Sequence, residues 1–148
     1  MTQATKVTIL KYGSIGLIAF GLLNFLSLFP VLEPVMRVFL NLVFLTTFGS
    51  DHQLGADAAR LWIGISGGLL AGWGATLLLI ATQLYPIDPV LGRRIILTGV
   101  ISWFVLDSAG SIAAGAPFNA VLNLSFLFVF ALPVAWPERR SVSASQIA

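Results

Sequence analysis

Asp107 is the residue in this sequence whose position most clearly requires a chemical explanation. It stands in the segment WFVLDSAGS, within an apolar run long enough to cross a bilayer. A carboxylate inside such a run costs about 3 kcal/mol on insertion scales, so its surroundings must compensate for it. The side chain is therefore expected to be paired with a cation, protonated, or open to water.

Polar residues that could meet Asp107 occur at a similar predicted depth in the apolar runs. They are Arg60, Asn24, Asn119, Asn123 and Ser111. Asn119 and Asn123 are four residues apart and therefore share one face of a helix. Two interpretations stay open. One is a structural Asp107–Arg60 pair completed by amide groups, and the other is an outward-facing polar pocket for a small ligand or a proton.

The rest of the sequence offers no recognisable catalytic machinery. It has no Cys, and a single histidine, His52, is too little for a metal site or a haem ligand pair. There is no HExxH, no glycine-rich fingerprint after a strand and no phosphate loop. These absences favour a non-enzymatic protein with no catalytic residue, no metal and no cofactor.

Composition and run length predict a membrane protein. Hydrophobic residues make up 57% of the chain and charged residues 9%, whereas soluble domains carry about 25% charged residues. A membrane-spanning helix needs about 20 apolar residues. Four runs meet this length, at about Tyr12–Leu32, Ala59–Tyr85, Arg94–Ala114 and Pro117–Trp136. We therefore expect an all-α four-helix transmembrane bundle as a single domain over residues 1–137, with a polar tail at 138–148.

The segment at about 34–48 is too short to span and predicts an outer amphipathic helix at the interface. Placing it outside leaves six basic residues on the other side: Lys6, Lys11, Arg93, Arg94, Arg139 and Arg140. The outer side then carries only Arg37 and Arg60 as basic residues. An excess of Lys and Arg on one side of the membrane is typical of the cytoplasmic side. It predicts a multi-pass protein of a bacterial-type inner membrane with both termini in the cytoplasm, and it explains the basic residues without a nucleic-acid partner.

Small residues on the second run predict close helix packing. Gly64, Gly68 and Gly72 recur every four residues, a spacing that lets a neighbouring helix approach closely. The favoured interpretation is packing within the same bundle, and the alternative is a homodimer face. Trp73 and Trp103 fall near mid-span and are expected to pack rather than to line a pocket.

The segments ARLWIGISGGLLAGWG and WFVLDSAGSIAAGAPFNAVLN lie in a four-span chain with a short amphipathic segment after the first span. In this architecture the chain resembles the small DoxX-like membrane proteins. The resemblance implies a four-helix membrane fold, and some DoxX-type proteins are linked to quinone-coupled sulfur oxidation.

Three expectations for function follow. The first is a protein that binds a small apolar or amphipathic ligand or serves as an accessory subunit of a larger membrane complex. Its partners would be the bilayer and either other membrane subunits or a second copy. The alternatives are a small transporter that uses Asp107 and a DoxX-like quinone-linked redox component.

Overall fold

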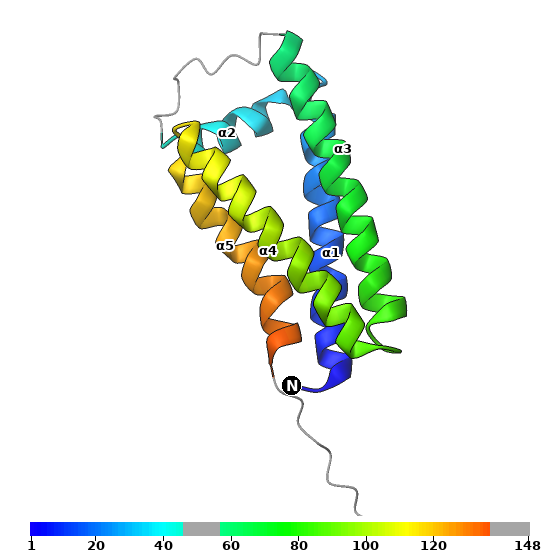
Figure 1. Ribbon diagram of the computed structural model, residues 1–148. Coiled ribbons are helices and arrows are strands. Elements are labelled where there is room, and N and C mark those ends of the chain that lie inside the picture. Colours follow the sequence, from blue (N-terminus) through cyan, green and yellow to red (C-terminus); the bar gives the residue numbers. More distant parts are fainter. Residues whose placement is uncertain (46–56, 137–148) are drawn as a thin grey trace, which may run out of the picture.

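The computed structural model describes residues 1–45 and 57–136, apart from the side chains of Asp57, Ala58 and Arg60. Within these ranges every element of regular secondary structure is a helix (Figure 1). The elements are α1 (Gln3–Leu26), α2 (Glu33–Val43), α3 (Asp57–Leu79), the π-helical turn η1 (Ile80–Leu84), α4 (Pro89–Ala113) and α5 (Pro117–Ala135). Four of the helices are long and apolar enough to cross a membrane. The predicted all-α bundle is confirmed, and the chain is a multi-pass membrane protein.

The first helix starts and stops earlier than its apolar run predicts. α1 begins at Gln3 because the Thr2 hydroxyl caps it, accepting a hydrogen bond from the Thr5 amide at 3.2 Å. It ends at Leu26, where the Ser27 hydroxyl donates to the Asn24 carbonyl at 2.6 Å. Apolarity marks where lipid covers the chain, whereas capping groups mark where the helix begins and ends.

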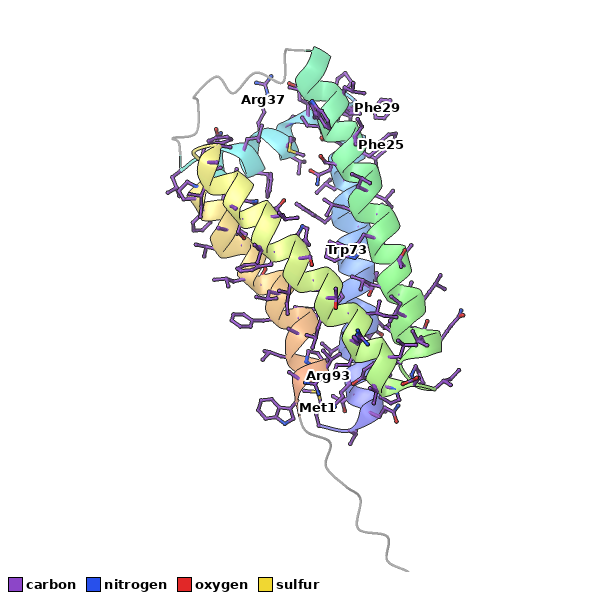
Figure 2. All side chains as sticks on the ribbon, viewed as in Figure 1. Met1, Phe25, Phe29, Arg37, Trp73 and Arg93 are labelled. Carbon is purple, nitrogen blue, oxygen red and sulfur yellow. The ribbon has the colours of Figure 1, made fainter. Side chains whose placement is uncertain are left out.

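The short helix predicted at about 34–48 is observed as α2, from Glu33 to Val43. Its first turn is held by an ion pair, in which Arg37 Nη2 lies 2.7 Å from Glu33 Oε1. Figure 2 shows Arg37 on the side of α2 that points away from the long helices. The last residues of the predicted segment fall among 46–56, outside the described residues.

The long helices form two closely packed pairs, α1 with α3 and α4 with α5, and α1 also packs on α5. The pairs converge at the end that carries Met1 and diverge towards α2, which crosses the open end (Figure 1). A core of buried apolar side chains fills the convergent half. Its members are Leu10, Leu17, Leu77, Ala81, Tyr85, Ile96, Val100, Phe130 and Val134.

Polar contacts fasten the convergent end. The buried Lys6 ammonium donates to the Trp136 carbonyl at 2.8 Å, where a cation complements the carboxyl end of α5. Gln3 Nε2 donates to the Pro86 carbonyl at 3.2 Å and so ties α1 to the turn after η1. Met1 and Arg93 both lie at this end of the molecule (Figure 2). The bundle is thus closed at the terminal end and splayed at the other.

The predicted packing of this glycine face within the bundle is wrong at Gly68 and Gly72, whereas the alternative of a homodimer face stays a prediction. Gly68 and Gly72 are exposed, and a Cβ added to either would meet nothing within 4 Å. Gly64 is half-buried, and a Cβ added there would lie 3.1 Å from the Leu28 side chain. Gly68 and Gly72 therefore lie on the outside of the bundle rather than against a neighbouring helix.

Other glycines of α3, Gly67 and Gly74, make the close approach to α1. A Cβ on Gly67 would lie 2.7 Å from the Gly21 carbonyl oxygen of α1, and one on Gly74 would lie 2.9 Å from the Ile18 amide nitrogen. Consecutive residues of an α-helix are turned by about 100°. The face of Gly67 and Gly74 therefore differs from the face of Gly68 and Gly72, although both stripes consist of small residues.

Candidate functional site

A cavity of about 730 Å³ lies where the two helix pairs diverge. All of α1, α2, α3, α4 and α5 contribute side chains to its wall. This volume is within the range of about 300–1,000 Å³ that is typical of small-molecule sites. The cavity exists because the core seals only the convergent half of the bundle.

Asp107 anchors a polar cluster on one wall of the cavity. Its Oδ2 accepts hydrogen bonds from Asn123 Nδ2 at 2.6 Å and from Asn119 Nδ2 at 3.1 Å. Asn119 Nδ2 also donates to the Ser111 hydroxyl at 2.8 Å, and Asn123 Nδ2 donates to the Ser108 hydroxyl at 3.2 Å. The two amide groups thus supply the donors that a carboxylate in apolar surroundings requires.

The tight turn between α4 and α5 explains why these residues meet. Asp107 is six residues before the end of α4 at Ala113, and Asn123 is six residues after the start of α5 at Pro117. Residues at equal distances from the turn of an antiparallel hairpin lie level with each other. At 1.5 Å per residue, both lie about 9 Å from the turn. Gly115, with a φ of +78°, permits that turn.

The remaining predicted site residues are placed differently. Asn24 lines the cavity from α1, is 9% exposed, and makes no side-chain hydrogen bond to another described residue. Arg60 belongs to the first turn of α3, and its side chain lies outside the described residues. The predicted Asp107–Arg60 pair therefore stays a prediction. Within the described part of the chain, no basic side chain forms a salt bridge with Asp107.

Aromatic rings form the floor of the cavity below the polar cluster. Phe20 of α1 and Trp103 of α4 each contact Phe126 of α5, with ring centroids 6.1 Å apart in both pairs. Trp103 also contacts Trp73 of α3, with ring centroids 5.5 Å apart and ring planes inclined at 45°. Trp73 packs against the core, as the sequence predicted, but Trp103 both packs and lines the cavity. The floor separates the polar cluster from the apolar core.

The side of the cavity between α3 and α4 is exposed. Leu106 of α4 and Trp62 of α3 both line the cavity, yet they are 74% and 65% exposed. α4 meets the other pair through η1, near the convergent end, and through the contact between Trp103 and Trp73. A molecule dissolved in the bilayer would reach the polar cluster through this seam.

The sequence analysis did not predict the aromatic floor, although aromatic residues stand three or four positions from polar residues of the cavity wall. Trp103 precedes Asp107 by four residues, Phe20 precedes Asn24 by four, and Phe126 follows Asn123 by three. On each of these helices, an aromatic ring therefore lies one turn from a polar group on the same face. Because the chain directions differ, every one of these rings falls on the convergent side of its polar neighbour. Reading the two residue types together would have indicated a polar layer over an aromatic one.

Comparison of the chain with models of protein families, with curated proteins and with solved structures gave no match. The interpretation of the site therefore rests on its geometry and chemistry.

Proposed function

We propose that this chain is a non-enzymatic membrane protein that binds a small amphipathic molecule in the cavity between its helix pairs. The observation that carries the proposal is the layered cavity wall, in which the hydrogen-bonded Asp107 cluster lies above the ring of Phe20, Trp103 and Phe126. The polar part of a ligand would meet the cluster, and its apolar part would lie along the rings and the seam.

The packing of the convergent half favours binding over transport. A permease needs a polar route on both sides of its ionisable residue. Below the aromatic floor the described chain instead has the apolar core, including Leu10, Val100 and Phe130, each at most 1% exposed. A solute at Asp107 would have to disrupt this core to continue.

The proposed orientation places the convergent end in the cytoplasm and the cavity in the outer half of the bilayer. Lys6, Lys11, Arg93 and Arg94 belong to the convergent ends of α1 and α4. Basic residues of this kind are retained on the cytoplasmic side. The cavity would then exchange ligand with the outer leaflet.

A pair of glycine substitutions provides the test. Gly110 lines the cavity and Gly68 does not, yet a Cβ at either position would meet nothing within 4 Å. Gly110→Trp should therefore fill the cavity, whereas Gly68→Trp should add an indole to the lipid-facing side of α3. The wild type and both variants would be purified in nanodiscs and their bound small molecules identified by mass spectrometry.

We expect a small molecule to remain with the wild type and with Gly68→Trp and to be lost from Gly110→Trp. The identity of that molecule also tests the alternatives, because a quinone would support the redox role implied by the DoxX-like resemblance. A co-purifying protein that binds regardless of Gly110→Trp would favour an accessory subunit instead. Identical small molecules in all three preparations would refute binding in the cavity.

A further inference from the structure

We infer that the ligand of this cavity carries a cationic, hydrogen-bond-donating head, as in a long-chain primary ammonium, with its apolar chain along the aromatic floor. This inference rests on the proposed function and specifies the class of ligand. It follows from which atoms of the polar cluster are already used and which are not.

The amide donors of the cluster are consumed internally. Each Asn Nδ2 carries two hydrogens, and each makes two hydrogen bonds, one to Asp107 Oδ2 and one to a serine hydroxyl. The Oδ1 atoms of Asp107, Asn119 and Asn123 have no hydrogen-bond partner among the described residues. Apart from the hydroxyl hydrogens of Ser108 and Ser111, the cluster therefore presents acceptor oxygens. A ligand that complements the three Oδ1 atoms must bring donors.

These acceptors are open to the cavity. No buried side-chain oxygen or nitrogen among the described residues lacks a partner, so the unpaired oxygens must retain accessible surface. All three residues line the cavity although Asn123 is only 5% exposed. Asn24 lines the same space from α1, nine-tenths buried and without a side-chain partner among the described residues, and its amide oxygen adds a further acceptor.

The charge of the wall also favours a cation. Among the described residues that line the cavity, Asp107 is the only ionisable one. A carboxylate attracts an ammonium and repels a carboxylate, sulfate or phosphate head, and the attraction is strong where water is scarce. Trp62, Trp103 and Phe20 supply ring faces in the same wall, to which a cation is also attracted.

The test uses matched ten-carbon amphiphiles. Decylammonium, decanol and decyl sulfate share one chain and differ in the charge and donors of the head. Each would be added at equal mole fraction to nanodiscs containing the wild type, Asp107→Asn or Gly110→Trp. The shift in thermal unfolding midpoint of each protein would report binding, because a ligand of the folded state stabilises it. Gly110→Trp corrects for effects of the amphiphile on the bilayer.

The inference predicts that decylammonium stabilises the wild type more than decanol does and that decyl sulfate gives no shift beyond that in Gly110→Trp. Asp107→Asn should weaken decylammonium binding about tenfold or more, because it removes the charge that strengthens the hydrogen bond. Since the order of the three probes on the wild type is itself diagnostic, the test holds even if Asp107→Asn does not fold.

Two results would overturn the inference in distinguishable ways. If decanol or decyl sulfate bound the wild type at least as tightly as decylammonium, the cavity would bind amphiphiles but not select a cation, and the proposed function would survive. If none of the probes distinguished the wild type from Gly110→Trp, both the cationic ligand and the proposed function would fail.

Discussion

Adjacent glycines on α3 should respond oppositely to the same small substitution. In the wild type, Gly67 lies against the backbone of α1, where an added Cβ would be 2.6 Å from the Phe25 amide nitrogen. Ordinary contacts begin at 3.4 Å, so the methyl carbon of Gly67→Ala would be 0.8 Å too close. The obstacles are backbone atoms of α1, since the Gly21 carbonyl oxygen would also be only 2.7 Å from this Cβ. The two helices must therefore separate.

Such overpacking costs about 1–3 kcal/mol, and α1 with α3 is one of the two closely packed pairs of the bundle. Gly68→Ala is the matched control. Its Cβ meets nothing within 4 Å, and alanine in a helix is favoured over glycine by up to about 1 kcal/mol. Gly68→Ala should therefore be neutral or slightly stabilising.

The assay is reversible unfolding of both variants in mixed detergent micelles, followed by circular dichroism. Gly67→Ala should unfold at a lower mole fraction of denaturing detergent than the wild type, and Gly68→Ala at the same or a higher one. If Gly67→Ala were as stable as the wild type, α1 and α3 could not be in backbone contact at this point. If Gly68→Ala were the destabilised variant, the face at every fourth residue would pack after all.

Three further predictions address the cluster, the closed end and the orientation. Asn123→Ala should lower the free energy of unfolding by about 1–3 kcal/mol because it removes a donor to Asp107. Adding Asp107→Ala should cost less than the sum of the single changes in a double-mutant cycle, and additivity would argue against their contact. Lys6→Met should keep the buried apolar stem of the side chain but lose the hydrogen bond to the Trp136 carbonyl at the end of α5. Hydrogen exchange should then increase in the last turn of α5, and unchanged exchange would contradict the role of this contact. Reporter fusions after Arg140 and at Gln53 should report cytoplasm and periplasm respectively, and a periplasmic signal after Arg140 would reverse the proposed orientation.

The fold could be predicted from the sequence because two strong physical constraints act on it. An apolar run of about 20 residues must be helical in lipid, since its backbone has no other hydrogen-bond partners there. Helix ends were less predictable, because α1 starts at Gln3, directly after a threonine cap and nine residues before Tyr12, the first residue of its predicted span.

The meeting of Asp107 with Asn119 and Asn123 was foreseeable from a short turn and equal distances to it. The cavity was not, because it depends on how far two helix pairs splay, and no local pattern encodes that angle. The glycine face was mispredicted for a related reason. α3 carries overlapping small-residue stripes, and only the position of α1 decides that Gly67 and Gly74, rather than Gly68 and Gly72, are in contact.

The central claim is that the cavity binds amphiphiles at the Asp107 cluster, and side-chain amide spectra test it most directly. Isotopically labelled protein in nanodiscs would be titrated with decylammonium and, separately, with decanol, while the Nδ2 resonances of Asn119 and Asn123 are followed. We predict a saturable shift of both resonances with at least one of the two probes in the wild type and in Gly68→Trp, and none in Gly110→Trp. If neither probe shifted these resonances saturably, or if Gly110→Trp responded like the wild type, the cavity would not be a binding site.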